Sequence, residues 1–258
     1  MPLNIAIAGV GGRMGGALIS AAQSRPDVRV VGGTTRAGAP AIADGVTAKQ
    51  DVAAAAGSAD VWIDFTTPDA TLVALHALAN DTRVRAAIVG TTGLTADQEA
   101  RVAEHATRIA IVRSGNFSLG VNLLAGLVRD AAARLGKDWD IEILEAHHRR
   151  KIDAPSGTAL MLGEAAAQGR GVALKDVRLS PNDGNTGPRT EGGIGFASQR
   201  GGGIFGEHEV MFASEREVLR LSHQALDRGV FADGALAAAL WAANKPPGLY
   251  SMRDVLGL

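Results

Sequence analysis

Short apolar runs alternate with alanine-rich stretches of helical length through the first half of the chain. The apolar runs are rich in β-branched residues and predict strands over residues 3–8, 28–33, 61–65, 86–89 and 109–112. The stretches between them predict helices near 12–23, 68–80 and 95–106. Because this alternation is typical of βαβ units, we predict an α/β fold with a Rossmann-like doubly wound parallel sheet.

After residue 119 the periodicity changes. The pattern predicts a long helix over 121–135, a strand over 141–146, a helix over 158–167 and a polar loop or lid over 180–193. Three alternating runs, 194–200, 207–213 and 217–224, predict an antiparallel meander with a turn at the glycines 201–203. An alanine-rich helix over 229–244 follows. We predict a smaller α+β domain with a mixed or antiparallel sheet.

These patterns divide the chain into two domains. Residues 1–118 are expected to form a dinucleotide-binding domain, which the C-terminal helical segment 229–258 completes. Residues 119–228, where the strand and helix alternation has ended, are expected to form a domain for substrate binding and oligomerisation.

Composition narrows the classes of protein that fit. The chain has 258 residues, 46% of them hydrophobic and 21% charged, which indicates one or two folded domains. A formal net charge of -1 gives no overall field that would favour nucleic acid or an anionic membrane, so an anionic ligand needs a local cationic cluster. Because there is no cysteine, disulfides, thiolate metal sites and cysteine nucleophiles are excluded. We see no basic signal segment and no apolar run of about 18 residues, and therefore expect a cytoplasmic protein.

The first predicted strand runs into a glycine-rich turn, Gly9-Val10-Gly11-Gly12-Arg13-Met14-Gly15. A phosphate can approach the backbone N–H groups of a helix N-terminus only where side chains are absent, and the helix dipole favours the anion. The spacing fits the G-x-x-G-x-x-G form of a dinucleotide loop, and its place in the first strand-to-helix turn supports that interpretation. The alternative is a tight turn that only packs the helix against the strand.

The end of the second predicted strand bears on the choice of cofactor. Dinucleotide folds usually have an acidic residue about 20 residues after the glycine loop, where it binds the ribose hydroxyls. This chain has Thr35 and Arg36 there, and no carboxylate between Asp27 and Asp44. We therefore predict NADPH as the preferred cofactor, with Arg36 and Arg13 as partners of the 2′-phosphate, and leave NADH open as a second cofactor. Arg36 as a solvated loop residue is the alternative.

The most informative segment runs from Glu145 to Ala159. Five consecutive residues are cationic or titratable near neutral pH: His147, His148, Arg149, Arg150 and Lys151. Ser156, Gly157 and Thr158 then precede an apolar helix, so a hydroxyl-capped helix N-terminus is expected beside the same loop. This combination predicts a site for a small polyanion with one or two carboxylates, where histidine and lysine can also move a proton.

Other interpretations of the basic run stay open. It resembles a nucleic-acid patch, although aromatic residues are only 4% of the chain. A histidine pair suggests a metal, but adjacent residues on a strand face opposite sides, so His147 and His148 do not form a metal site and we expect none. A solvated loop is the third interpretation.

Together these residues resemble the dihydrodipicolinate reductase (4-hydroxy-tetrahydrodipicolinate reductase) family of lysine and diaminopimelate biosynthesis. The resemblance is carried by the cationic segment, the glycine loop and the short motifs at 90–93, 114–118 and 252–255, and it extends over essentially the whole chain. It implies hydride transfer from NAD(P)H to a cyclic dicarboxylate, which gives tetrahydrodipicolinate after loss of water. It also implies a homotetramer assembled through the sheet of the second domain.

The resemblance assigns roles residue by residue. His147 matches the family's proton donor and acceptor, and Lys151 matches its proton-donating lysine. His148, Gly157 and Thr158 match the substrate-binding positions. The positions that match the cofactor loops are Gly9, Val10, Gly11, Gly12, Arg13, Met14, Gly90, Thr91, Thr92, Ser114, Gly115, Asn116 and Phe117, to which the end of the second strand adds Thr35 and Arg36.

Two positions depart from the family pattern. Members that use NADH well often have an acidic residue where this chain has Thr35, and Ser114-Gly115 replaces a commoner pair of alanines. The first departure favours NADPH. Two alternative functions stay open: another NADP-dependent imine or hydroxy-acid reductase, and a non-catalytic dinucleotide sensor whose basic loop contacts a partner.

Overall fold

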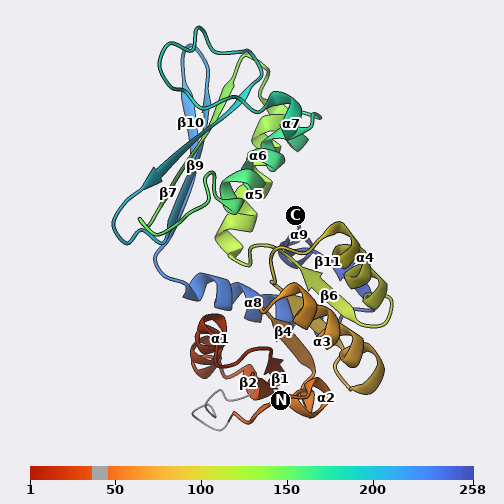
Figure 1. The fold of residues 1–258 in the computed structure, drawn as a ribbon. Helices are drawn as coiled ribbons and strands as arrows, with labels where there is room; N and C mark the ends of the chain where they lie inside the picture. The colour runs from red at the N-terminus through yellow and green to blue at the C-terminus, as the bar shows by residue number, and fades with distance from the viewer. Residues whose placement is uncertain (37–45) are drawn as a thin grey trace. The chain divides into compact units, whose positions relative to one another are not determined.

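The computed structural model describes residues 1–36 and 46–258, and the chain divides into two compact units (Figure 1). The first unit contains Met1–Leu119 and Gly229–Leu258, and the second contains Gly120–Arg228. Each unit has a sheet and a hydrophobic core of its own. Within the described residues, no helix is long and apolar enough to cross a membrane.

A parallel sheet forms the centre of the first unit, and its described strands follow the order β11-β6-β5-β4-β1-β2-β3. The strands are β1 (Leu3–Ile7), β2 (Val28–Thr34), β3 (Ala48–Lys49), β4 (Val61–Asp64), β5 (Ala86–Val89), β6 (Ala110–Arg113) and β11 (Gly248–Tyr250). The chain steps outward from β1 to β3, returns beside β1 as β4 and continues to β6, which confirms the predicted doubly wound sheet. The edge strands β3 and β11 are absent from the sequence prediction because two or three residues carry no readable periodicity.

Helices cover both faces of this sheet, which is why its strands are continuous apolar runs. Ile5 and Ile7 of β1 belong to a core with residues of α1, α8 and α9, whereas Ala6 belongs to a core with residues of α2, α3 and α4. The helices are α1 (Arg13–Gln23), α2 (Val52–Ala56), α3 (Pro68–Asp81), α4 (Ala96–His105), α8 (Gly229–Ala242) and α9 (Met252–Leu256). The alternation of neighbouring side chains along β1 thus supplies both cores.

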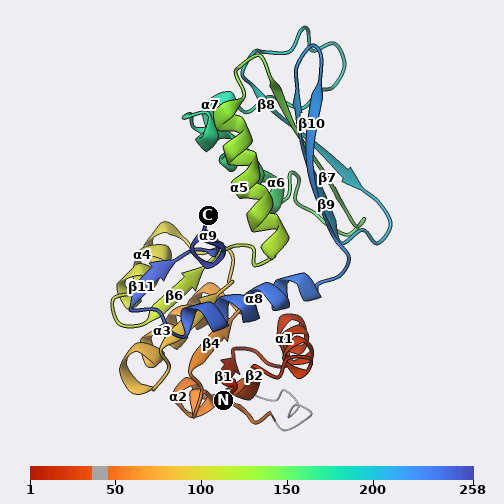
Figure 2. The same ribbon diagram turned by 180° about the vertical axis from the view of Figure 1, so that it is seen from behind.

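Small residues let α8 pack closely within the first unit, where it contacts α1 (Figure 2). A Cβ atom added to Gly234 would lie 1.6 Å from the carbonyl oxygen of Phe117, so no larger residue fits there. The expected C-terminal helical segment is in fact helix α8, strand β11 and helix α9. The segment therefore adds a strand beside β6 as well as a helix on the sheet.

The structure describes every residue of the second unit, which has a four-stranded sheet in the order β10-β9-β7-β8. The strands are β7 (Asp140–His147), β8 (Ile194–Arg200), β9 (Gly206–Ala213) and β10 (Val218–Ala225). The predicted meander is wrong in part, because β7 lies between β8 and β9 and pairs with β8 in parallel. The glycines 201–203 therefore lie on a crossover rather than in a hairpin, and the sheet is mixed.

Helices α5 (Leu119–Arg134), α6 (Gly157–Gly169) and α7 (Leu174–Val177) contribute to the core of the second unit. Alternate residues of β7, Ile141 and Ile143, are fully buried in that core. The stretch predicted as a loop, 180–193, contains neither helix nor strand. Arg189 fastens it to β7, with ion pairs of 2.9 Å to both Asp140 and Glu142.

Candidate active site

The glycine turn after β1 has the geometry of an open backbone loop. Gly9 has a φ of 64°, a left-handed conformation that favours glycine, and the N–H of Gly12 donates to the carbonyl of Gly9 at 2.8 Å. The N–H of Gly9 donates to Oγ1 of Thr34 at 3.2 Å, which ties the turn to the end of β2. Gly11 and Gly12 are exposed, and α1 begins directly afterwards. Because Gly11 and Gly12 have no side chains, an anionic group can approach the backbone N–H groups just before α1.

Two further glycines explain how closely this turn packs. A Cβ atom on Gly15 would lie 2.5 Å from the carbonyl oxygens of Gly9 and Val10. A Cβ atom on Gly33 would lie 2.3 Å from the carbonyl oxygen of Ile7. The packing role that was the alternative interpretation therefore belongs to these buried glycines, while Gly11 and Gly12 are exposed and leave the backbone before α1 open to an anionic group.

The predicted partners of a 2′-phosphate lie on the same edge of the sheet. Arg36 follows β2, Arg13 opens α1, and both side chains are exposed. Thr35 is half-buried, and its N–H donates to the carbonyl of Lys49 at 2.9 Å. Because β1 and β2 are adjacent parallel strands, their carboxyl ends are neighbours, and the two cations begin from neighbouring loops.

The loops after β5 and β6 also lie at this carboxyl edge, but two of their side chains point into the protein. The hydroxyl of Thr91 is buried and lies 2.7 Å from that of Thr71. Phe117 is 1% exposed and packs edge to face against Phe65 with 5.3 Å between ring centroids. A dinucleotide at this edge would therefore meet the backbone of these two residues and not their side chains.

Short contacts shape the rest of these loops. Gly90 cannot carry a side chain, because a Cβ atom would lie 2.0 Å from the Phe65 ring. Ser114 closes its loop by donating to the carbonyl of Asn116 at 2.6 Å and accepting from the N–H of the same residue at 3.1 Å. Thr92 and Gly115 are exposed. We refer to the turns after β1, β2, β5 and β6 as the dinucleotide edge.

A buried carboxyl group beneath the dinucleotide edge has no counterpart among the predicted residues. Asp64, the last residue of β4, is 1% exposed and accepts from the N–H of Thr66 at 2.9 Å and from its hydroxyl at 2.5 Å. Burial raises the pKa of Asp64, although the bonds from Thr66 oppose that effect. Asp64 thus organises the loop after β4 from below.

In the second unit, the cationic run leaves β7 at His147 and divides into an inner and an outer part. His147 is 9% exposed, His148 and Lys151 are half-buried, and Arg149 and Arg150 are exposed. Nδ1 of His148 is buried and has no hydrogen-bond partner in the described part of the chain. The three inner side chains are those to which the family resemblance assigns proton transfer and substrate binding, whereas the side chains of the two arginines are exposed.

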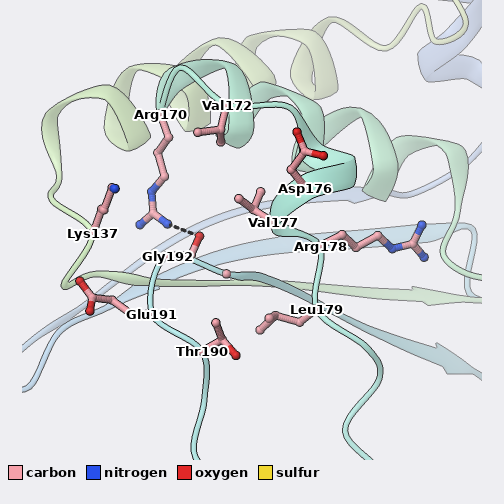
Figure 3. A pocket seen from close by; sticks show the side chains of 11 residues that line it. Lys137, Arg170, Val172, Asp176, Val177, Arg178, Leu179, Thr190, Glu191 and Gly192 are labelled. Atoms are coloured by element: carbon pink, nitrogen blue, oxygen red, sulfur yellow. Dashed lines mark hydrogen bonds between the residues drawn. The ribbon is translucent and has the colours of Figure 1, made fainter.

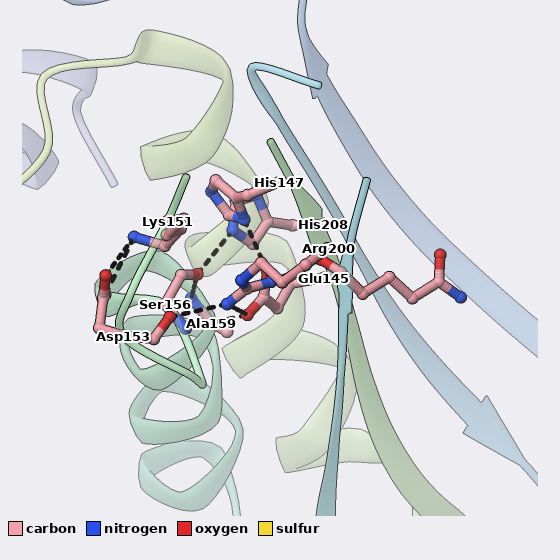
Figure 4. A network of polar contacts seen from close by, with 9 residues as sticks. Glu145, His147, Lys151, Asp153, Ser156, Ala159, Arg200 and His208 are labelled. Atoms are coloured by element: carbon pink, nitrogen blue, oxygen red, sulfur yellow. Dashed lines mark hydrogen bonds and ion pairs between the residues drawn. The ribbon is translucent and has the colours of Figure 1, made fainter. Parts of the chain in front are cut away.

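Behind His147 lies a network of hydrogen bonds centred on Glu145 (Figure 4). The Glu145 carboxylate, which is 1% exposed, accepts two bonds from Arg200, at 2.7 and 2.8 Å. It also lies 2.6 Å from Nδ1 of His147 and accepts from the N–H of Ser156 at 3.1 Å. One carboxylate therefore joins β7, the end of β8 and the residue before α6.

Ser156 and His208 complete this network. The hydroxyl of Ser156 accepts from the N–H of Ala159 at 3.1 Å, which confirms the predicted hydroxyl cap of α6. The same hydroxyl lies 3.0 Å from Nε2 of His208, whose ring packs edge to face against His147 with 5.1 Å between centroids. We call Glu145, His147, Ser156, Arg200 and His208 the Glu145 cluster.

Burial and charge oppose each other in the Glu145 cluster. Burial acts to raise the pKa of Glu145, but hydrogen bonds, those from Arg200 first, outweigh it and lower that pKa to about 2. Burial lowers the pKa of His147, and the hydrogen bond and charge of Glu145 act in the opposite direction. Burial, followed by the neighbouring His147, lowers the pKa of His208 to about 4. At neutral pH Glu145 is therefore charged and His208 is neutral.

Lys151 is held at the rim of the cluster by its own loop. Its Nζ lies 2.9 Å from the carboxylate of Asp153, which is 57% exposed, while the lysine side chain is 19% exposed. The hydrogen bond from Lys151 lowers the pKa of Asp153. Gly157 is exposed and Thr158 is half-buried at the start of α6. A carboxylate ligand at this place would meet an ammonium group and a helix N-terminus from the same loop.

A cavity of about 230 Å³ elsewhere in the second unit contains none of the predicted residues (Figure 3). Arg170 donates to the carbonyl of Gly192 at 3.1 Å on its wall. Lys137 and Arg178 add two more cations, while Asp176 and Glu191 add carboxylates. The charges of this cavity are mixed, so it does not compete with the cationic loop as a site for a dianion.

Glu145, Arg200 and His208 have no catalytic or binding role among the predictions from the sequence. Glu145 had a readable signal, because residues two apart on a strand share a face and Glu145 precedes His147 by two. Arg200 had none, since only the parallel pairing of β7 with β8 sets it opposite His147. In the described parts of the chain, no group of three histidine or acidic side chains could hold a metal ion.

A doubly wound sheet with a glycine turn at its carboxyl edge, followed by a mixed-sheet unit that gathers histidine, lysine and a helix N-terminus, defines a dinucleotide-dependent reductase of two domains. Residues 3–117 match the family described as dihydrodipicolinate reductase, N-terminus, and residues 120–256 match its C-terminus. The chain belongs to the dihydrodipicolinate reductase family, whose members are NAD(P)H-dependent reductases.

Similar proteins agree with this membership. The 4-hydroxy-tetrahydrodipicolinate reductase of Caulobacter vibrioides is 56% identical over 99% of this chain and 98% of the relative. That of Methylocella silvestris is 50% identical over 99% of this chain and 97% of the relative. Among solved structures, the dipicolinate-bound dihydrodipicolinate reductase of Paenisporosarcina sp. TG-14 has a TM-score of 0.81 at 23% identity, covering 98% of this chain and 99% of that chain. The structural likeness supports the fold.

Proposed function

We propose that this chain reduces 4-hydroxy-tetrahydrodipicolinate to tetrahydrodipicolinate in lysine and diaminopimelate biosynthesis, with NADPH preferred over NADH. The observation that carries the proposal is the inner part of the cationic loop. Lys151, His148 and the start of α6 gather donors for carboxylates beside His147, in a chain whose net charge is only -1. The Caulobacter relative, which covers nearly the whole chain, carries the name of this activity.

The reaction takes up one hydride and one proton and releases one water. A bound dinucleotide supplies the hydride from its nicotinamide ring, and Gly9 to Met14 with the loops after β5 and β6 are the residues that would hold it. His147 and Lys151 supply and hold the proton, because an imidazole or an ammonium beside the ring can neutralise charge that develops next to the new C–H bond. His148, Gly157 and Thr158 bind the carboxylates and fix the ring.

Single substitutions test these roles. His147→Ala and Lys151→Ala should each lower kcat with the cyclic dicarboxylate by about 10²- to 10⁴-fold, the usual effect of losing a proton-transfer residue. Arg150→Ala is the matched control, since Arg150 is an exposed cation of the same loop, and it should stay within twofold. If His147→Ala and Lys151→Ala also stayed within twofold, the assigned roles would be wrong.

The cofactor preference has its own test. The dissociation constants of NADPH and NADH should differ at least tenfold in favour of NADPH, as expected when a guanidinium binds a 2′-phosphate in place of a carboxylate on the ribose. Arg36→Ala should reduce that ratio, whereas Arg29→Ala, exposed near the other end of β2, should leave it unchanged. Equal affinities in the unmodified protein would contradict the preference.

We also propose a cytoplasmic homotetramer assembled through the sheet of the second unit. Val218 and Leu219 of the edge strand β10 are 52% and 40% exposed on opposite sides of the sheet, which leaves apolar surface at this edge for another copy. Sedimentation equilibrium should give four times the chain mass of 26.5 kDa, and a monomer at micromolar concentration would contradict the proposal.

A further inference from the structure

Each of the two oxygens of the Glu145 carboxylate has two polar partners. One oxygen accepts from Arg200 at 2.7 Å and from the N–H of Ser156 at 3.1 Å. The other accepts from Arg200 at 2.8 Å and lies 2.6 Å from Nδ1 of His147. A carboxylate that is buried and bonded on both oxygens has a fixed orientation, so it can impose an orientation on its partners.

We propose that Glu145 is the positioning residue of this site and that it acts through His147. A carboxylate at Nδ1 holds the proton of the neutral imidazole on that nitrogen and leaves Nε2 as the atom that gains or gives a proton. Gly206 leaves room beside Nε2, since a Cβ atom there would lie 3.1 Å from it. The proposal rests on the proposed function in so far as His147 takes part in the reaction.

Arg200 also contacts the loop that carries Lys151. Its guanidinium donates to the carbonyl of Asp153 at 2.7 Å, and the N–H of Gly201 donates to the carbonyl of His147 at 2.9 Å. Arg200 therefore holds the far end of the loop that carries Lys151 through Asp153, while Glu145 contacts the same end through Ser156 and the near end through His147. Arg200 also limits the negative potential that Glu145 exerts on the imidazole.

The charged and titratable groups that act on His147 come from every neighbouring element. Glu145 of β7 raises the pKa of His147, whereas Lys151 of the loop and Arg200 of β8 lower it. His208 of β9 packs on the ring and is neutral at neutral pH. Removing the charge of Glu145 should consequently lower the pKa of His147, and removing the charge of Arg200 should raise it.

These opposite signs separate positioning from simple structural support. Nitrogen-15 NMR of the histidine rings in the full-length protein can follow the tautomer and pKa of His147, assigned by comparison with His147→Asn among 6 histidines. We expect the Nδ1–H tautomer in the unmodified protein. Glu145→Gln should lower the pKa of His147 by about one unit and mix the tautomers, and Arg200→Gln should raise it by a similar amount.

Two more variants control for folding and for charge. Glu142 lies on the same strand as Glu145, and its carboxylate is paired with Arg189 as that of Glu145 is paired with Arg200. Glu142→Gln should leave the pKa of His147 unchanged. Glu145→Asp keeps the negative charge, so it should lower the pKa of His147 less than Glu145→Gln does. If Glu145→Gln does not fold, Arg200→Gln and Glu145→Asp still decide the direction of the shift.

The kinetic measurement uses the same variants. Glu145→Gln should lower kcat by about 10- to 100-fold, as loss of an orienting carboxylate does elsewhere, and leave the KM for NADPH within twofold. Where kcat needs protonated His147, activity falls as pH rises through its pKa, so that limb should move to lower pH in Glu145→Gln and to higher pH in Arg200→Gln.

The outcomes distinguish this proposal from the proposed function. If the pKa of His147 were unchanged in Glu145→Gln, or moved in the same direction in both variants, the positioning role would be overturned. If the pKa moved as expected but the pH profile of kcat did not follow it, Glu145 would still position His147, and the proposed role of His147 in the reaction would be wrong.

Discussion

The dinucleotide edge and the Glu145 cluster are built in opposite ways. At the dinucleotide edge the turn after β1 works because side chains are missing, and a Cβ atom at Gly15 or Gly33 would collide with backbone oxygens. In the Glu145 cluster the contacts depend on a charged side chain, since one buried carboxylate receives two bonds from Arg200, lies beside His147 and accepts from the backbone N–H of Ser156. The first kind of site is therefore sensitive to added atoms, and the second is sensitive to lost charge.

The largest expected contrast between the two regions is in acid stability. The pKa of Glu145 lies at about 2 in the folded chain against an ordinary value of 4.5. Because the folded-state pKa is depressed, the stabilisation is complete above about pH 5 and disappears as pH falls through 4.5 towards 2. Its size is about 3–4 kcal/mol, because a tenfold change in an acid dissociation constant corresponds to about 1.4 kcal/mol.

Urea unfolding followed by circular dichroism between pH 7 and pH 2.5 measures this contribution. The difference in stability between the unmodified chain and Glu145→Gln should shrink by most of that amount as the pH falls, because the protonated carboxyl and the amide are both neutral. Glu142→Gln, whose carboxylate is paired with Arg189 nearer the surface, should show a smaller convergence. Parallel curves for Glu145→Gln would show that its charge does not hold the cluster together.

A smaller effect is expected at the dinucleotide edge, where two glycines of α1 form a matched pair. Gly15→Ala adds a methyl group 2.5 Å from two backbone oxygens, which should destabilise the chain by about 1–3 kcal/mol and weaken NADPH binding. Gly16→Ala adds a methyl group with no atom within 4 Å beyond the neighbouring backbone of its own helix, and it should stabilise the helix by about 0.5–1 kcal/mol.

Thermal unfolding and NADPH titration of both variants sharpen the comparison. Neither effect involves a charge, so the difference in stability between Gly15→Ala and Gly16→Ala should persist at 1 M salt. The difference in stability between the unmodified chain and Glu145→Gln should change with salt, because it depends on charge. Equal stability and equal affinity of the two alanine variants would mean that the turn after β1 tolerates side chains.

The contrast also explains what the sequence could predict. Gly9, Gly12 and Gly15 lie within one turn and one helix start, so their spacing and their place after the first predicted strand predict a glycine turn, and the structure has that turn there. Glu145 and Arg200 are 55 residues apart and meet only because β7 pairs with β8. The same pairing overturned the predicted meander, since consecutive strands need not be neighbours in a sheet.

The ion pair between Lys151 and Asp153 should give the smallest effect, and it tests how far side-chain charge governs the cationic loop. Nζ of Lys151 lies 2.9 Å from a carboxylate that is 57% exposed, so the pair contributes little to stability, and Asp153→Asn should change it by less than about 0.5 kcal/mol. Under the proposed function, a carboxylate of the substrate that binds beside Lys151 would compete with Asp153 for the same ammonium group. Asp153→Asn should therefore lower the KM for the cyclic dicarboxylate by about two- to fivefold, the equivalent of an exposed ion pair, and leave kcat within twofold.

The effect of Asp153→Asn on KM should fade as salt is raised, because the ion pair is accessible to solvent. A higher KM would reverse the conclusion: Asp153 would then hold Lys151 in place for the substrate rather than compete with it.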